Sequence, residues 1–201
     1  MKPINWEPME DYIFGKHKLN GKILNIGCGA FLNPKIMIEE NNKGPELSFV
    51  HIDIDKEAIE ILSKDYPKED IRVMDAVKLG FSNNYFDNVI GMYNIYDEVY
   101  PLNKRKKAFK EAFRVLKPDG LFIISSHNFL WKLIHPIKIL KLGLYNNFRM
   151  CGDYCKGRKY NNYYQGSTSK TIKQVEEAGF VFVERFPKSV FARCPTMVFR
   201  K

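Results

Sequence analysis

The chain has 201 residues, of which 45% are hydrophobic and 14% aromatic, and a formal net charge of +9 at pH 7. This composition argues against a disordered chain, and the length fits one domain, since domains usually hold on the order of 100–200 residues. No apolar run reaches the roughly 18 residues of a spanning helix, and the first residues lack the apolar core of a signal peptide, so we expect a soluble cytoplasmic protein.

Strands and helices are predicted to alternate along most of the chain. Apolar runs bounded by turn residues predict strands at 22–27, 48–54, 71–74, 86–90, 121–124, 180–183 and 196–199. Apolar residues at three- and four-residue spacing, with polar caps, predict helices at about 34–40, after Asp55 up to Pro67, after Asn103 up to the 117–120 stop, and after Ser169 up to Ala178.

The order of these elements predicts an α/β fold, a three-layer doubly wound sheet of seven mostly parallel strands. The last strand is expected to be antiparallel, because only a short connection around residues 187–195 precedes it and a parallel neighbour needs a crossover of about a dozen residues. Residues 1–201 should form one domain. Residues 1–20 could form a short helix or a flap over the first glycine turn, and the sequence leaves both open.

The first predicted strand ends in a glycine turn at residues 27–29, and a helix start follows it. Gly27 and Gly29 allow positive φ and let a ligand approach the backbone closely. The free N–H groups of the helix start add donors for an anionic or nucleotide ligand. A tight turn without a ligand is the alternative.

Acidic residues end the next two strands. Asp53 has the spacing from the glycine turn that is typical of a carboxylate binding ribose hydroxyls, and Asp75 can accept a hydrogen bond from an exocyclic amine. Singly, either acid could be an ordinary loop residue, and Asp55 is most simply a helix cap. Together with the glycine turn, they favour a nucleotide-type ligand at the carboxyl ends of the strands.

With these motifs the chain resembles the class I S-adenosylmethionine-dependent methyltransferases, in the subgroup that mostly modifies small molecules. The similar segments are residues 23–29, 52–54, 74–76, 86–90 and, most specifically, 114–121. The resemblance covers about 20–127 and 166–201. It implies S-adenosylmethionine as the cofactor and methyl transfer as the reaction.

The resemblance also implies a role for each matching residue. Gly27, Cys28 and Gly29 would pass under the methionine and ribose, Asp53 would bind the ribose hydroxyls, and Asp75 would face the adenine amine. The implied cofactor site comprises Asn25, Gly27, Cys28, Gly29, Asp53, Ile54, Met74, Asp75, Ala76, Tyr93 and Asn94.

Two residues depart from the family pattern. Asn25 stands where the family usually has an acid, so it can order the turn by hydrogen bonding but brings no charge near the cofactor's ammonium. Phe31 stands where a third glycine is common, and with Leu32 it argues against a dinucleotide site, which needs that glycine for close helix packing.

Methyl transfer depends mainly on aligning the acceptor with the methyl group, which can supply roughly 7–11 kcal/mol. A base is needed only where the acceptor must lose a proton. His127 is the best placed candidate, just beyond the fifth strand, with Tyr93, Asp97 and Glu98 as alternatives. His127 could equally be a loop residue that only hydrogen-bonds. The four cysteines lack a paired CxxC spacing, so free thiols and no metal are expected.

Residues 128–170 break the alternation and concentrate the charge. They hold eight Lys or Arg against one acid, Asp153, together with eight aromatic residues. The very apolar stretch 129–142 predicts a lid on the acceptor side. A membrane-surface patch and a solvated face over a small extra core are the alternatives.

Residues 128–170 are predicted to be an insertion in the domain, and we refer to them as the insertion. The sequence therefore predicts methyl transfer to a small-molecule acceptor that is covered by this insertion. An RNA methyltransferase, whose basic and aromatic side chains would contact phosphates and bases, is one alternative, and a non-catalytic cofactor-binding protein is another. Nucleic acid is the less favoured partner because the basic residues share their stretch with apolar surface. The sequence predicts no oligomeric state.

Overall fold

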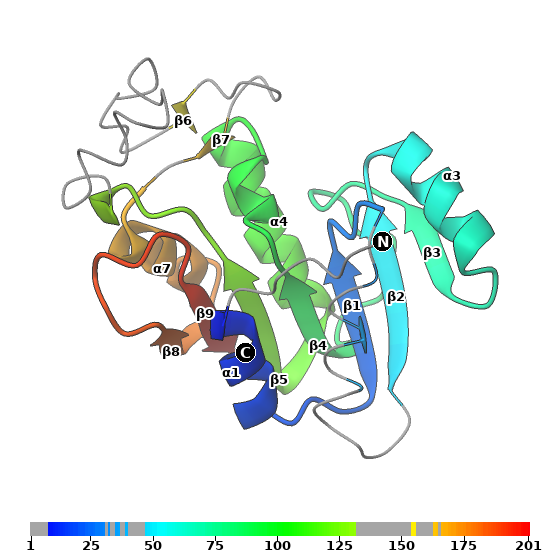
Figure 1. Ribbon diagram of the computed structural model, residues 1–201, viewed down its shortest axis with the longest axis horizontal. Helices are drawn as coiled ribbons and strands as arrows, with labels where there is room; N and C mark the ends of the chain where they lie inside the picture. The colour runs from blue at the N-terminus through cyan, green and yellow to red at the C-terminus, as the bar shows by residue number, and fades with distance from the viewer. Residues whose placement is uncertain are drawn as a thin grey trace.

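The structure is a computed structural model that describes residues 8–30, 32, 35–36, 39, 47–131, 154–155, 163–164 and 166–201. Its main sheet has the order β3-β2-β1-β4-β5-β9-β8 and runs across the molecule from β3 to β8 (Figure 1). The strands are β1 (Lys22–Ile26), β2 (Ser48–Asp53), β3 (Asp70–Val73), β4 (Phe86–Gly91), β5 (Leu116–Ser125), β8 (Val181–Phe186) and β9 (Thr196–Arg200).

The strand directions confirm the predicted fold class. Strands β1 to β5 pair in parallel, and β9 is antiparallel to both of its neighbours, β5 and β8. The physical reason is the connection at residues 187–195, which suits a return along the neighbouring strand and is too short for a helical crossover. The molecule is an α/β protein with a seven-stranded, mostly parallel sheet and an antiparallel last strand.

Helices cover both faces of this sheet. They are α1 (Pro8–Lys16), α3 (Lys56–Asp65), α4 (Leu102–Val115), α7 (Thr168–Glu176) and the single turn η1 (Ile95–Asp97). Phe109 of α4 and Val175 of α7 share a core with Leu24 of β1, whereas Phe14 of α1 packs with Ile23 on the opposite face. Successive side chains of a strand point to opposite faces, so β1 contributes to both cores.

Within the N-terminal segment, residues 8–16 form a helix, which is one of the two forms that the sequence left open. Helix α1 contacts β8 and β9. Tyr12 stacks on Phe186 with ring centroids 4.1 Å apart. Residues 1–7 lie outside the described ranges.

One predicted helix cap is confirmed and two are wrong. Asp55 accepts hydrogen bonds from the backbone N–H groups of Glu57 and Ala58 at the start of α3. Helix α4 begins at Leu102, ahead of the expected cap Asn103, and Pro101 precedes it. Ser167 rather than Ser169 caps α7, accepting from Lys170 N at 3.2 Å. Several neighbouring polar residues satisfy the same cap pattern, so only the backbone decides between them.

The predicted stop at residues 117–120 becomes a bulge inside a strand. Helix α4 ends at Val115 and β5 begins at once with Leu116. The pairing with β4 then jumps from Leu116 to Leu121, and Asp119 has a φ of 63°. The Lys-Pro-Asp-Gly sequence thus ends the helix and bends the strand into the sheet.

Other predictions fall partly outside the described residues. Of the expected helix 34–40, Lys35, Ile36 and Glu39 are helical, and Phe31 is not described. Within 128–170, β6 (Tyr154–Cys155) and β7 (Tyr163–Tyr164) form an antiparallel pair. The lid and the one-domain organisation with an insertion stay predictions.

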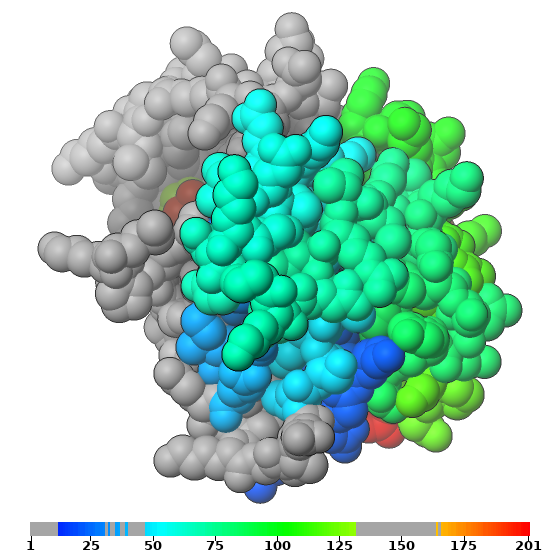
Figure 2. All heavy atoms as spheres, turned by 90° about the vertical axis from the view of Figure 1, so that its right-hand side faces the viewer, coloured from blue at the N-terminus to red at the C-terminus, as the bar shows by residue number. Residues whose placement is uncertain are grey.

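Figure 2 shows the face of the molecule at the β3 edge of the sheet, where α3 and β3 occupy the middle of the surface. Among the residues placed in the structure, no helix is both long and apolar enough to cross a membrane. Cys28 and Cys194 are free thiols, as expected. A cytoplasmic location stays a prediction from the sequence.

The cap of α7 can be tested with two serines that lie two residues apart. Ser167→Ala should lower the free energy of unfolding by about 1 kcal/mol, because the N–H of Lys170 loses its acceptor. The matched control Ser169→Ala removes an exposed hydroxyl inside the helix and should change it by less than about 0.5 kcal/mol. Urea unfolding measures both values, and a larger loss for Ser169→Ala would contradict the assignment.

Candidate functional site

A cavity of about 490 Å³ lies at the carboxyl ends of the parallel strands. Its size falls in the range of about 300–1,000 Å³ typical of small-molecule sites, and its position is where open α/β sheets bind ligands. The predicted site residues that line it are Gly27, Gly29, Asp53, Ile54, Met74, Asp75, Ala76 and Tyr93. Four other predicted residues do not line it, namely Asn25, Cys28, Asn94 and His127.

The glycine turn after β1 forms one wall of the cavity. Gly27 and Gly29 have φ values of 72° and 53°, which favour glycine. A Cβ on Gly27 would lie 2.0 Å from the side chain of Ile95, whereas one on Gly29 would meet no atom within 4 Å. Gly27 is therefore needed for packing against η1, and Gly29 leaves open space beside the backbone.

Asp53 connects the glycine turn to the next helix. Its Oδ2 accepts from Gly29 N at 2.7 Å, and its Oδ1 accepts from Asp55 N at 2.9 Å. The residue is 9% exposed and still borders the cavity. A carboxylate has about four acceptor sites, so these two bonds leave Asp53 further capacity to accept from a ligand.

The segment after β3 supplies a second polar group between apolar surfaces. Asp75 accepts from Val77 N at 3.0 Å, which fixes the turn that presents it. Met74 and Ala76, its neighbours in the chain, also line the cavity, as does Ile54, which directly follows β2 and is 69% exposed. A flat ring could lie between these apolar side chains with its polar edge toward Asp75.

Asn25 and Cys28 point away from the cavity into the protein. The Asn25 amide donates to His51 Nδ1 at 3.0 Å, and both residues are buried. Burial lowers the pKa of His51 to about 4, so its ring is neutral and can accept this bond. Burial and the charge of Asp53 raise the pKa of Cys28 to about 12, so its thiol is not a nucleophile at neutral pH.

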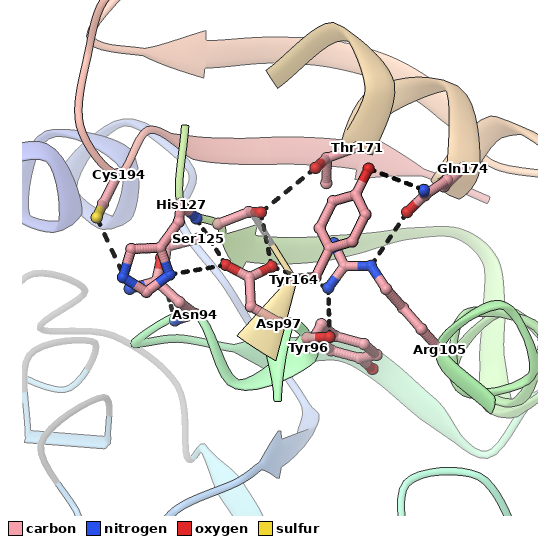
Figure 3. Close-up of polar contacts among 11 residues, drawn as sticks. Asn94, Tyr96, Asp97, Arg105, Ser125, His127, Tyr164, Thr171, Gln174 and Cys194 are labelled. Atoms are coloured by element: carbon pink, nitrogen blue, oxygen red, sulfur yellow. Dashed lines mark hydrogen bonds and ion pairs between the residues drawn. The ribbon is translucent and has the colours of Figure 1, made fainter. Parts of the chain in front are cut away.

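A buried carboxylate, Asp97, organises the region beside the cavity (Figure 3). Its side chain is fully buried and accepts from Arg105 Nη1 and Ser126 Oγ, each at 2.8 Å. It also accepts from the backbone N–H of His127 at 2.6 Å and contacts His127 Nδ1 at 3.0 Å. With four donors around it, Asp97 serves to position neighbours and is not placed to reach an acceptor molecule.

Arg105 connects Asp97 to residues in the second half of the chain. It is fully buried and donates to Gln174 Oε1 at 3.0 Å and to the carbonyl of Tyr96. Its guanidinium lies over the ring of Tyr164 at 4.3 Å, and Gln174 donates to the Tyr164 hydroxyl at 3.0 Å. Tyr164 of β7 is thus anchored on Arg105 of α4 and Gln174 of α7 (Figure 3).

Sequence reasoning missed Arg105, although a signal was present. Arg105, Ala108, Phe109 and Ala112 follow the i, i+3, i+4, i+7 spacing of one helix face, and all four are buried. Because Arg105 stands in a run of basic residues, it is easily assigned to the solvent-exposed face of the helix, although its position belongs to the buried face. Ser126, Tyr164 and Gln174 carried no comparable signal because their partners lie on other elements.

His127 emerges from this network with a defined orientation. A carboxylate oxygen accepts hydrogen bonds, so His127 Nδ1 is the donor in its contact with Asp97, which directs this edge of the ring toward the buried acid. The side chain is 30% exposed. The structure therefore presents His127 as a partly exposed imidazole oriented by a buried carboxylate.

Tyr93 and Asn94 form a strained turn between β4 and η1. Their φ values are 58° and 62°, in the left-handed region that non-glycine residues rarely adopt. Tyr93 is 42% exposed and lines the cavity, whereas Asn94 lies inward, its N–H donating to Ser125 Oγ at 3.0 Å. Strain of this kind concentrates at functional sites.

Glu98 lines the cavity, and its surroundings shift the pKa of its side chain. Partial desolvation, followed by the negative charges of Asp53 and Asp97, raises its pKa above the ordinary value, while His127 acts in the opposite direction. The sequence named Glu98 as a candidate base and did not place it in the cofactor cavity. Within the described part of the chain, no group of His, Cys, Asp or Glu is arranged to hold a metal ion.

Comparison with known families identifies this arrangement. Residues 24–124, half of the chain, match the family described as a methyltransferase domain. The chain belongs to the class I S-adenosylmethionine-dependent methyltransferases. The cofactor of this family is S-adenosylmethionine, and the matched residues contain the glycine turn, both strand-end acids and η1.

Curated proteins, two of them named as methyltransferases, match parts of this chain. An uncharacterized protein of Methanocaldococcus jannaschii is 33% identical over 68% of this chain and 47% of its own length. A ubiquinone/menaquinone biosynthesis C-methyltransferase of Rickettsia prowazekii is 29% identical over 57% of this chain and 47% of its own. A tRNA (carboxymethyluridine(34)-5-O)-methyltransferase of Arabidopsis thaliana is 32% identical over 51% and 23%. The chain spans about half or less of the length of these relatives.

Solved structures share the fold across nearly the whole chain. An S-adenosylmethionine-dependent methyltransferase from Clostridium acetobutylicum has a TM-score of 0.72 at 14% identity, covering 98% of this chain and 92% of its own. A 1,6-didemethyltoxoflavin-N1-methyltransferase from Burkholderia thailandensis has a TM-score of 0.66 at 16% identity, covering 96% and 76%. At these identities the likeness shows the fold alone.

The buried ion pair can be tested against an exposed one on the same helix. Arg105→Met should lower the free energy of unfolding by about 3–5 kcal/mol, because Asp97 would stay buried without its cation. The control Lys106→Met removes an ion pair with Glu177 that is 44% exposed on both sides and should cost less than about 1 kcal/mol. Equal losses in chemical denaturation would contradict the importance of the buried network.

Proposed function

We propose that this protein transfers a methyl group from S-adenosylmethionine to a small-molecule acceptor. The observation that carries the proposal is the cavity at the strand ends, where the glycine turn, Asp53 and Asp75 border one volume in a chain of this family. The alternatives are a methyltransferase that acts on RNA and a protein that binds the cofactor without methyl transfer.

The residues present fit the cofactor. Gly29 faces open space, so a ligand can lie against the backbone there. Asp53 retains acceptor capacity for ribose hydroxyls, and Asp75 can accept from the adenine amine. Ile54 and Met74 would flank the ring, and the methionyl part would extend past the glycine turn toward Tyr93.

The protein's own contribution to the reaction is alignment and, where needed, proton removal. Bound S-adenosylmethionine supplies a methyl group on a sulfonium. Tyr93 borders the cavity and would position the acceptor by its ring or hydroxyl. His127, with Nδ1 directed to Asp97, would remove a proton at Nε2 from an acceptor that must lose one.

The comparisons support a small-molecule acceptor but also keep RNA as the second candidate. One relative is a ubiquinone/menaquinone biosynthesis methyltransferase, and one structural neighbour was solved with bound 1,6-didemethyltoxoflavin. Another relative is a tRNA methyltransferase, and residues 128–170 hold eight Lys or Arg against one acid. We favour the small molecule because that basic stretch is also strongly apolar, which suits a cover over a ligand better than a solvated phosphate-binding arm.

Asp53 provides the test of cofactor binding. Asp53→Asn should weaken S-adenosylmethionine binding by about 1–3 kcal/mol, because one charged acceptor for the ribose hydroxyls is lost in a nearly buried position. Asp65→Asn, on the exposed end of α3, is the matched control and should leave the affinity unchanged. Isothermal titration calorimetry measures both, and an unaltered affinity of Asp53→Asn would refute its assigned role.

The acceptor class can be tested by following formation of S-adenosylhomocysteine. We expect product formation with an ultrafiltered low-molecular-mass extract of cells, and none with purified total RNA. Activity that follows the RNA and disappears after ribonuclease treatment would overturn the proposal in favour of an RNA methyltransferase. Tight cofactor binding without turnover on either fraction would instead indicate a non-catalytic protein.

The role of His127 can be read in the same assay. For an acceptor that loses a proton, His127→Gln should lower turnover by about 10²-fold or more while the S-adenosylmethionine affinity stays constant. Asp97→Asn should lower turnover in the same direction, because Nδ1 loses its charged partner. Full activity of His127→Gln would show that no base acts at this position.

A further inference from the structure

Four acidic side chains line the cofactor cavity, and three of them are already hydrogen-bonded to the backbone. Asp53 accepts from Gly29 N and Asp55 N, Asp55 accepts from Glu57 N and Ala58 N, and Asp75 accepts from Val77 N. These bonds fix the turns that shape the cavity. The fourth acid, Glu98, has no such role, because no donor in the described part of the chain is bonded to its carboxylate.

Glu98 is held at the cavity wall by its backbone rather than by its side chain. It ends η1, where its N–H donates to Ile95 O at 3.1 Å. The neighbouring residue Asp97 points inward to Arg105, whereas Glu98 lines the cavity. Lys104 also lines the cavity, but no ion pair joins it to Glu98 among the described residues.

The charges around Glu98 are mostly negative. Partial desolvation and the carboxylates of Asp53 and Asp97 disfavour its ionised form. His127 acts in the opposite direction, but among the described residues no cation is paired with Glu98 within salt-bridge distance. A carboxylate placed in this way gains from a cationic ligand. S-adenosylmethionine carries two positive charges at its methionyl end, the sulfonium and the ammonium, and Asn25 is turned away from the cavity toward His51.

We propose that Glu98 is the carboxylate that recognises the positive charge of the cofactor's methionyl group. This inference rests on the proposed cofactor binding and adds a residue of η1 to that site. It assigns Glu98 to charge recognition rather than to removal of a proton from the acceptor. Binding of the cation and loss of the Glu98 proton are then coupled, because only the ionised carboxylate attracts the ligand.

Calorimetry with a charged and an uncharged ligand tests this assignment. S-adenosylmethionine has both charges, whereas 5′-deoxy-5′-methylthioadenosine keeps the adenosine and lacks both. Glu98→Gln should weaken S-adenosylmethionine binding by about 5- to 20-fold and change methylthioadenosine binding by less than about 2-fold. Glu60→Gln, an exposed carboxylate on α3, is the control and should change neither.

The pH dependence supplies a second measurement. The Glu98 pKa is raised above the ordinary 4.5 in the free protein, and a bound cation lowers it. S-adenosylmethionine affinity should therefore rise as pH increases from about 4.5 toward 7, with proton release detected in buffers of different ionisation enthalpy. The slope and the proton release should both shrink in Glu98→Gln.

Other titratable or charged groups face this cavity, so the wild-type slope is compared with that of the variant. The groups that line the cavity are Asp53, Asp55, Asp75, Tyr93, Tyr100 and Lys104. Asp97 and His127 lie outside its lining but act on Glu98 electrostatically. Groups other than Glu98 keep their contribution in Glu98→Gln. The difference between the two profiles thus belongs to Glu98.

The stability of the free protein distinguishes charge recognition from a structural role. A carboxyl group with a raised pKa favours the folded state most below its unfolded pKa and loses that contribution as pH rises through the folded value. Glu98→Gln should therefore raise the Tm of the ligand-free protein at pH 7, and this gain should vanish at low pH. A lowered Tm would show that Glu98 supports the fold and would overturn the inference.

Two further outcomes separate the inference from the proposed function. If wild-type protein binds neither ligand, cofactor binding itself fails. If wild-type protein binds S-adenosylmethionine and Glu98→Gln binds it equally well, or loses affinity for both ligands alike, the role of Glu98 fails while the cofactor assignment stands.

Discussion

The buried carboxylate of Asp97 is the constraint on which the rest of the site depends. An isolated charge in the interior is costly, so its burial requires that donors converge on it from several elements. Arg105 comes from α4, and Ser126 and His127 follow β5. Each donor brings its element to a defined position, which places η1 against the carboxyl ends of β4 and β5. The orientation of His127 is a by-product of satisfying this charge.

Asp97 and Glu98 are adjacent acids that differ in their exposure to solvent, and this difference gives them different roles. Asp97 is fully buried, and its four donors hold it in place. Glu98, one residue later, faces an open cavity with no bonded donor in the described residues, and its pKa is raised. The first carboxylate stabilises the fold because its partners are present, and the second is left with unused acceptor capacity. A polar group of this second kind is where a ligand gains most.

The glycine turn and the turn after β4 are fitted to each other. Ile95 occupies the space that a Cβ of Gly27 would need, so the two strand ends approach closely only because residue 27 is glycine. Reaching this position takes the chain through two consecutive left-handed residues, Tyr93 and Asn94. The cost of these conformations is offset by the packing of Ile95 and by the bonds of Asp97, which follow directly in the chain. The result is close packing of the glycine turn against η1 at the wall of the cavity.

The sequence by itself determined the sheet, its antiparallel last strand and the residues at the ends of β1, β2 and β3. These are local matters, because Gly27, Asp53 and Asp75 end apolar strands, and parallel strands place their carboxyl ends on one edge. Only the tertiary structure decided that Asn25 turns to His51, that Arg105 enters the core from a basic run, and that Glu98 faces the cavity while Asp97 does not. The reason is that the orientation and burial of a polar side chain depend on its distance from water and on hydrogen-bond partners many residues away in the chain. Neither quantity is present in the local pattern of the chain.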